Sequence, residues 1–313
     1  MKVIYLLPVL IASASSFSLS AQELGYIPAS NAAPEKPAKP VKRINVCDFN
    51  VQTGILLQSE VDGSVDDFKK INPNSSILNS NLEGFQSYSG WSASGNRAFS
   101  VQLGLQFSDK EKKAYKSNPL LRLGLFYFSA NNLSSNLYKE TRSDYDTLSS
   151  GSTGATILQD SVTTHSYSMS HLAEQIRFDG SLIFRTNPAA RWSLYSGIGI
   201  SAGVTFQTET RILSTYNIRV ENHYQDGSTT VASYYFPPEY TYYEKQKTKN
   251  GFGGSAYIPM GLDFRIGKKN EFWKQVHLFL EVRPGMNFTA IPELRTVANA
   301  YMQSGFGVRV AWD

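Results

Sequence analysis

The sequence predicts an all-β protein, an eight-stranded antiparallel transmembrane β-barrel with long extracellular hairpin loops. Three observations predict it. Eight segments alternate apolar and polar residues with a period of two, which is typical of strands with two unlike faces. None of the apolar faces carries a charged residue, although charged residues make up 18% of the chain. The connections between the segments alternate between long and short, as they do in outer-membrane barrels.

Composition excludes several classes of protein before any pattern is considered. The chain has 313 residues, one cysteine and a net charge of +4. One cysteine excludes a disulfide scaffold, and the small net charge gives no indication of a nucleic-acid partner. No apolar run after the first 20 residues is long enough for a transmembrane helix. A hydrophobic fraction of 41% suits a soluble β-protein and a membrane barrel equally.

The first 43 residues are predicted to lie outside the folded barrel. Residues 1–21 start with Met1-Lys2, continue with a short apolar run and end in small residues, which indicates a secretory signal peptide. Residues 22–43 are rich in proline and lysine and favour extended polyproline II structure. We interpret them as a mobile periplasmic tail, with a tether to a periplasmic partner or the cell wall as the alternative.

Residues 44–313 form the predicted barrel. The apolar face of each strand is made by every second residue of its segment, and the polar face by the residues between them. In chain order the apolar faces run from Phe49 to Leu57, Phe99 to Phe107, Leu121 to Tyr127, Ile176 to Phe184, Trp192 to Phe206, Ala256 to Ile266, Val276 to Phe288 and Met302 to Trp312.

The opposite faces are rich in glycine and arginine and contain no lysine. A soluble β-sandwich would favour Lys, Glu and Thr on a face that meets water. Glycine suits a crowded barrel interior, and arginine pairs well with carboxylates inside it. An eight-stranded barrel is just wide enough to be filled by its own side chains, so we expect a plug rather than a conduit. The predicted ion-pair network consists of Arg122, Arg177, Asp179, Asp263, Arg265, Glu281, Arg283 and Arg309.

The connections predict an orientation. Long loops are expected at about 58–97, 129–170, 207–252 and 289–298, and short ones at about 108–119, 187–190 and 267–273. Short turns face the periplasm in outer-membrane barrels, so both termini should be periplasmic. Aromatic residues at the strand ends would form the two interfacial girdles. Pro259 and Pro284 lie inside predicted strands, where we expect β-bulges or strand segments above the membrane.

The end of the chain, from Gln303 to Asp313, resembles the C-terminal β-signal of bacterial outer-membrane proteins. Gln303, Gly305, Val308 and Val310 match that pattern in one register. Gly307, Val310 and Trp312 match it in another. The region 44–313 resembles the small eight-stranded OmpA/OmpX-like barrels and the PorT-like barrels of Bacteroidota. The resemblance implies insertion into the outer membrane by the barrel-assembly machinery.

The predicted external loops contain two candidate features. One is a tyrosine-rich segment near the end of the third long loop, because tyrosine is favoured at interfaces. Its proposed contact residues are Tyr234, Tyr235, Phe236, Tyr240, Tyr242 and Tyr243. The alternative is a ribbon packed on itself with solvated tyrosines. Thr147 and Ser161 lie in tripeptides that resemble an O-glycosylation motif of Bacteroidota.

No catalytic, cofactor-binding or metal-binding constellation is predicted. The four histidines are not spaced as metal ligands, and no glycine motif opens a helix that could cradle phosphate. The sequence therefore favours a non-enzymatic barrel that is a subunit or accessory of a larger envelope complex, with the external loops as binding surface. A stand-alone structural or adhesive barrel is the first alternative. A lipid-modifying enzyme that uses His165 or His171 is the second. Outer-membrane lipid and an envelope protein are the expected partners.

Overall fold

A computed structural model describes residues 44–88, 93–106, 119–149, 156–187, 190–224, 226–235, 241–267 and 269–312. The predicted signal peptide and the predicted Pro/Lys-rich tail lie outside these residues. So do Phe107 and most of the predicted short loop 108–119. The description below concerns the unit that begins at Val41.

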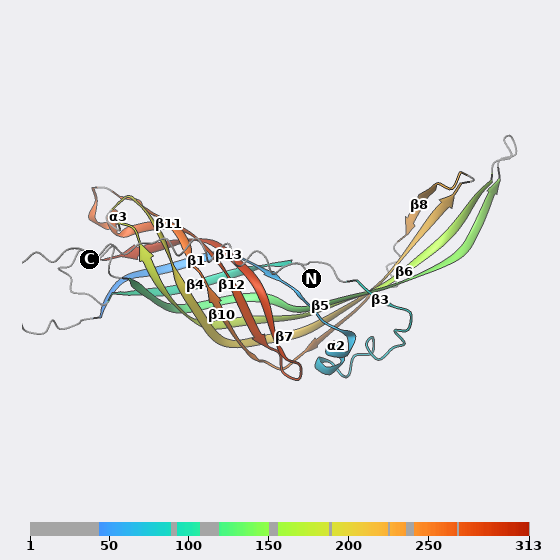
Figure 1. Ribbon diagram of the computed structural model, residues 1–313, viewed down its shortest axis with the longest axis horizontal. Coiled ribbons are helices and arrows are strands. Elements are labelled where there is room, and N and C mark those ends of the chain that lie inside the picture. Colours follow the sequence, from blue (N-terminus) through green and yellow to red (C-terminus); the bar gives the residue numbers. More distant parts are fainter. Residues whose placement is uncertain are drawn as a thin grey trace, which may run out of the picture. The chain divides into compact units, whose positions relative to one another are not determined.

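The described strands close into an antiparallel ring with eight positions (Figure 1). Each strand pairs with its neighbours in chain order, and the last strand pairs with the first, so the ring has no open edge. This confirms the predicted eight-stranded antiparallel barrel. The ring is formed in order by β1 (Asn45–Ser59), β4 (Ala93–Gln106), β5 (Leu120–Ser149), β6 (Thr156–Arg185), β7 (Trp192–His223), β10 (Phe252–Tyr257) with β11 (Met260–Arg265), β12 (Val276–Ala290) and β13 (Thr296–Ala311).

The two faces of the ring differ as the alternation predicted. Large apolar side chains point outward around it, with Phe178 on β6 78% exposed and Ile200 on β7 70% exposed. Polar and charged side chains, among them Arg122 and Glu281, are buried inside. Glycine makes room for them. A Cβ at Gly261 would lie 2.2 Å from the ring of Tyr195, so the tyrosine can cross the interior only over glycine.

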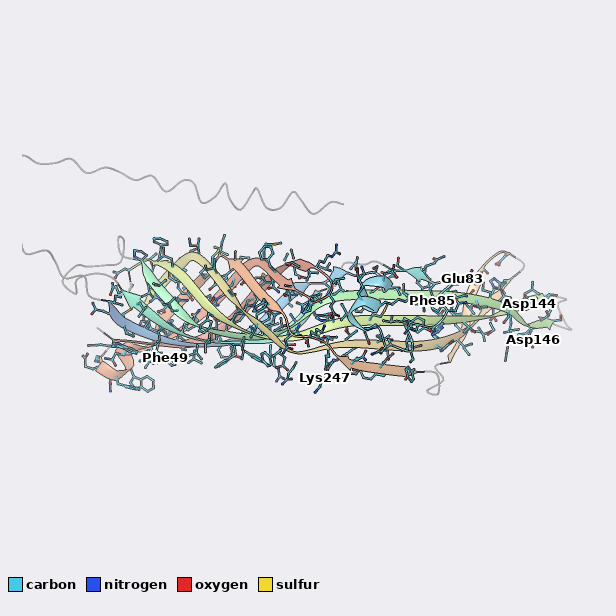
Figure 2. All side chains as sticks on the ribbon, turned by 90° about the horizontal axis from the view of Figure 1, so that it is seen from below. Phe49, Glu83, Phe85, Asp144, Asp146 and Lys247 are labelled. Atoms are coloured by element: carbon cyan, nitrogen blue, oxygen red, sulfur yellow. The ribbon has the colours of Figure 1, made fainter. Side chains whose placement is uncertain are left out.

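Three strands continue far beyond the ring. β5 and β6 have 30 residues each and β7 has 32. At about 3.3 Å per residue such strands are about 100 Å long. β8 (Thr229–Tyr235) and β9 (Tyr242–Lys247) pair with the outer part of β7. We call this end of the ring the hairpin end and the opposite end the turn end. Figure 2 shows Asp144 and Asp146 at the tip of the projection and Phe49 near the turn end.

This projection corrects the predicted loops. Residues 129–170 were expected to be a loop, but β5 and β6 stay paired from Leu120 to Ser149. Residues 289–298 were expected to form a long loop. The connection is shorter, because β12 ends at Ala290 and β13 begins at Thr296. Near the ring, one face of the continuing strands is covered by a hydrophobic cluster, and the other face is free to be polar.

Residues 61–88 of the predicted loop 58–97 form a folded cap on the inner face of the projecting sheet, the face that bears Leu133, Leu137 and Met169. The two ends of the predicted loop belong to ring strands, because β1 reaches Ser59 and β4 begins at Ala93. The cap contains β2 (Val61–Asp62), α2 (Val65–Ile71) and β3 (Gln86–Ser87), and both short strands pair with β5. Ser64 and Asp67 form a capping box that starts α2. Phe68, Ile71, Ile77 and Leu78 pack with side chains of β5, β6 and β7 in a hydrophobic cluster separate from the barrel interior.

The two prolines do not produce the expected bulges. Tyr257 pairs with Gly285 and Met260 with Val282, so the register is the same on both sides of Pro259. Pro259 interrupts the strand between β10 and β11, and the Ile258 N–H donates to the Pro284 carbonyl at 3.0 Å. Two residues, Ile258 and Pro259, therefore leave the regular strand pairing between β10 and β11, without a change of register.

The connection between β11 and β12 at the turn end contains the short helix α3 (Glu271–Gln275). Asn270 caps it through its side chain, and Phe272 and Trp273 are exposed. Among the described residues, no helix is long and apolar enough to cross a membrane, and this includes α2 and α3.

Candidate functional site

A cluster of four charged side chains fills the middle of the barrel interior. Glu281 accepts from Arg122 Nη1 at 2.6 Å and from Arg283 Nε at 2.5 Å. Arg283 Nη1 lies 3.3 Å from Asp179, which also accepts from the Tyr257 hydroxyl at 2.5 Å. β5, β6, β10 and β12 supply these residues, so the cluster joins strands around the ring. Each buried charge has a partner, which is the arrangement that a low-dielectric interior requires.

A second cluster lies around Asp263, nearer the turn end. Its carboxylate accepts from Arg309 Nε at 2.8 Å and lies 2.6 Å from His277 Nδ1. Arg185 Nη2 is 3.7 Å away, and Arg309 also reaches Asp48 at 3.4 Å. Asp48, Arg185 and His277 were not among the predicted network residues. The alternation placed all three on the polar face, but it could not show which groups meet across the ring.

Arg177 and Arg265 were predicted to belong to the ion-pair network, yet neither has a carboxylate partner among the described residues. Arg177 Nη2 donates to Asn287 Oδ1 at 2.6 Å, and its guanidinium lies 4.9 Å above the ring centre of Phe128. Arg265 is half-buried, and its Nε has no hydrogen-bond partner within the described chain. The network therefore divides into two clusters, with Arg177 held by an amide and an aromatic ring instead.

The predicted tyrosine surface is only partly described. Tyr234 and Tyr235 lie in β8, where their backbones pair with Arg219 and Ile218 of β7. Phe236 and Tyr240 lie outside the described residues. Tyr242 and Tyr243 are exposed in β9. Consecutive residues of a strand point to opposite faces, so these two side chains do not share one patch.

An ion-pair network joins the three long strands on one face of the projecting sheet. Arg219 Nη1 contacts Glu140 at 2.9 Å and its Nε contacts Glu221 at 2.7 Å, while Arg142 reaches Glu221 at 2.9 Å. The side chains surround Val162, which is fully buried. The network thus links β5 to β7 across β6, and we expect it to stiffen the outer part of the projection.

This network predicts acid-sensitive order in the projection. The hydrogen bond from Arg219 holds the pKa of Glu221 below its ordinary value of 4.5. A carboxyl with a lowered folded-state pKa stabilises above its unfolded pKa and loses that contribution as the pH falls through the folded value. The protection of the amides of residues 140–148 and 214–223, measured as the exchange rate relative to the intrinsic rate of an unfolded chain at the same pH, should therefore be lower at pH 3 than at pH 7. Arg219→Ala should speed this exchange about two- to fivefold at pH 7, the range of an exposed ion pair.

The control for this measurement is β1, whose amides should not respond to Arg219→Ala. Equal exchange of the projecting strands in the variant and the wild type would contradict a stiffening role for the network.

Two histidines named by the enzyme alternative lie on the inner face of the projecting sheet. His165 Nε2 is 2.9 Å from Ser214 Oγ, and the ring stacks on Tyr216 at 3.9 Å between centroids. A hydrogen-bonded serine and histidine form a hydrolytic triad only together with a carboxylate that orients the histidine. No carboxylate contacts the His165 ring among the described residues, and Ser214 is buried. The pair therefore lacks the acid that orients the base and free access to the nucleophile.

The structure also gives the places of the predicted glycosylation residues. Thr147 lies in β5 and Ser161 in β6, within paired strands rather than in a loop. Thr147 is exposed and Ser161 is half-buried. Modification of either remains a prediction, which mass spectrometry of peptides from native cells would test. Among the described residues, no group of three or more His, Cys, Asp or Glu side chains is placed to hold a metal ion.

Comparisons with known proteins give structural likeness at low identity. No protein-family model matches the chain, and no curated protein matches it in sequence. Ail, the attachment invasion locus protein of Yersinia pestis, aligns at 9% identity with a TM-score of 0.25, over 85% of this chain and 99% of Ail. Neisserial surface protein A aligns at 11% identity with a TM-score of 0.24, over 84% of this chain and 97% of that one. The barrel assignment rests on the closed ring of strand pairs.

Proposed function

We propose that this chain is a non-enzymatic outer-membrane β-barrel that acts as a subunit or accessory of a larger envelope complex. The observation that carries the proposal is the apolar outer face of a closed ring whose interior is filled by paired charges. A surface of this kind suits lipid, and a filled interior suits a plug rather than a pore. The C-terminal resemblance to a β-signal and the predicted signal peptide support the same location. They also support insertion by the barrel-assembly machinery and kinship with the small OmpA/OmpX-like or PorT-like barrels.

The difference between the two ends of the ring supports the proposed orientation. β1 begins and β13 ends at the turn end, which also carries the tight connections near residues 187–190 and 266–275. Short turns are periplasmic in known outer-membrane barrels. The hairpin end would then face the cell exterior, with both termini in the periplasm.

The projecting sheet is the proposed binding surface. It presents paired strands well beyond the ring, and Tyr242 and Tyr243 are 55% and 52% exposed on its two faces. Exposed tyrosines give a large contact area with a polar group at the tip. A stand-alone adhesive or structural barrel would use the same surface and is the first alternative. The lipid-modifying enzyme is the second alternative, and the buried Ser214–His165 pair, which lacks a carboxylate among the described residues, gives it little support.

Purification from native membranes in mild detergent tests the proposal. We expect one envelope protein to co-purify in stoichiometric amounts, and the double variant Tyr242→Ala/Tyr243→Ala to reduce its recovery at least fivefold. Phe272→Ala, which removes an exposed aromatic residue at the turn end, is the matched control and should leave recovery unchanged.

The alternatives predict different results. A stand-alone barrel would purify without a stoichiometric partner. An enzyme would release acyl chains from lipid A or phospholipid, and this activity would disappear in His165→Ala.

A further inference from the structure

The charges inside the ring do not balance. Five arginines and four carboxylates line the interior, and none of them has a side chain more than 9% exposed. The arginines are Arg122, Arg177, Arg185, Arg283 and Arg309, and the carboxylates are Asp48, Asp179, Asp263 and Glu281. Each arginine except Arg177 contacts one of these carboxylates. The interior thus carries one positive charge more than its negative charges, and the excess lies at Arg177.

An unbalanced charge at Arg177 is costly. An arginine side chain is not deprotonated in proteins, so Arg177 cannot become neutral as a buried lysine does. An isolated buried charge costs far more than a buried neutral polar group. The Phe128 ring, 4.9 Å from the guanidinium, compensates only part of this cost. Arg265, the other arginine without a carboxylate among the described residues, is half-buried, so water reaches it.

Two glycines make room for the Arg177 side chain on the barrel wall. Arg177 of β6 pairs across strands with Gly203 of β7, which pairs with Gly253 of β10. Gly253 in turn pairs with Thr289 of β12. A Cβ at Gly253 would collide with Arg177 Nη2, so the guanidinium lies over this glycine. Arg177 Nη2 then reaches β12, where it donates to Asn287 Oδ1 at 2.6 Å, and Thr289 lies two residues further on the same face.

The polar atoms without a partner around Arg177 can all donate hydrogen bonds. Gln175 Oε1 accepts from Arg177 Nη2, and Asn287 uses both of its side-chain atoms, with Nδ2 donating to Gln58 at 2.8 Å. Arg177 Nε and Nη1, Gln175 Nε2 and Thr289 Oγ1 have no partner within the described chain. Guanidinium and amide N–H groups only donate, and a hydroxyl can donate as well. A water or an alcohol would add hydrogens that need acceptors, whereas an anion only accepts. The set therefore favours an anion.

Enclosure and charge narrow the class of anion. Arg177, Gln175, Asn287 and Thr289 are each at most 1% exposed, so the site is closed to bulk solvent. An enclosed site suits a single-atom ion rather than phosphate, sulfate or an organic acid. One excess positive charge is balanced by a monovalent ion, while a divalent one would reverse the imbalance.

We propose that one halide ion, chloride under ordinary conditions, binds beside Arg177 and makes the barrel interior neutral. Gln175 Nε2 and Thr289 Oγ1 are its further ligands. Because the site is enclosed, the ion is taken up when the ring closes. The proposal concerns the ring interior alone, so it holds for each of the functions considered above.

Anomalous diffraction locates the ion. The full chain is refolded and crystallised in sodium bromide, since bromide can replace chloride and scatters anomalously. We expect an anomalous difference peak beside the Arg177 guanidinium and no peak there in Arg177→Met. Bromide at surface lysines and arginines alone would be an adventitious ion only. That result, or a water molecule in place of the ion, would overturn the proposal.

Urea unfolding of the full chain in detergent micelles measures what the ion contributes. Chloride is varied from about 10 to about 200 mM, with gluconate keeping the ionic strength and hence the screening constant. An ion that binds only the folded state raises the folding equilibrium constant in proportion to its concentration once the site is mostly occupied. We therefore expect an increase of about fivefold or more in the wild type and less than about 1.5-fold in Arg177→Met. Equal responses in the two proteins would contradict the proposal.

Thr289→Val tests the site with the arginine in place. Valine has a similar shape but no hydroxyl, so the same stabilisation should need about threefold more chloride or higher. Thr210→Val is the matched control, because Thr210 Oγ1 is also buried without a partner among the described residues but lies on the projecting sheet. This control should respond to chloride as the wild type does. The heat-dependent gel shift shows whether each variant folds. If Arg177→Met does not fold, an unchanged chloride response in Thr289→Val overturns the proposal.

Discussion

Replacing Glu281 by glutamine is expected to destabilise the folded barrel by about 3–5 kcal/mol, the usual cost of breaking a buried ion pair from one side. Glu281 is 1% exposed and holds Arg122 and Arg283 at 2.6 and 2.5 Å. The amide keeps the size of the side chain but removes its charge, so Arg122 loses its carboxylate partner and Arg283 keeps only Asp179. A urea titration in lipid vesicles, with the folded fraction read from unheated gels, measures the change.

Glu271→Gln is the matched control for this substitution. Glu271 forms an ion pair with Lys274 in α3, where its side chain is 84% exposed. Exposed pairs contribute about 0–1 kcal/mol, so the control should unfold close to the wild type. If Glu281→Gln shifted the free energy of unfolding no more than Glu271→Gln does, the interior cluster would not be a determinant of stability.

Replacing Ile200 by arginine is the second large expected effect. Ile200 points outward from the middle of the ring segment of β7. On the surface of a water-soluble protein this change would cost little, within about 0.5 kcal/mol. On the lipid-facing surface of a barrel, arginine near the bilayer midplane costs about 2–4 kcal/mol. We expect the larger value in vesicle refolding, together with a lower folded yield.

Leu158→Arg provides the comparison. Leu158 is also an exposed apolar residue on a long strand, but it lies in the outer part of β6, paired with His223 beyond the ring. In the proposed orientation it meets water, so the substitution should be nearly neutral. Similar costs at the two positions would argue against a membrane around the ring.

The ring was predictable because its outer face must be apolar at every second residue. The alternation from Ile176 to Phe184 assigned the strand to its two faces, and it placed Arg177 and Asp179 inside. The outer part of the same hairpin was not predictable. Residues 141–149 are exposed on both faces, so they carry no alternation even though all but Tyr145, which lies at a bulge, pair with β6.

The contacts within the sites were less predictable than the faces. Asp263 meets Arg309 and His277 because of the relative registers of three strands, and a period of two contains no information on register. Register also places His171, Thr210 and Gln246 opposite one another on β6, β7 and β9, and the alternation could not show this. The cap was missed because Phe68 and Ile71 lie in a stretch too short for a helical pattern to stand out.

The pairing of β1 with β13 has a consequence for the order of events during assembly. These strands are the first and the last of the ring, and they join along eleven consecutive residue pairs from Asp48–Ala311 to Gln58–Tyr301. The seam can therefore form only after the last strand has been delivered, and until then both strands present unpaired edges that invite aggregation. In the proposed orientation, the long hairpins would also have to pass through the membrane by that moment. Closure of the ring is thus a single late step, and protection of these two edges before it occurs would limit aggregation.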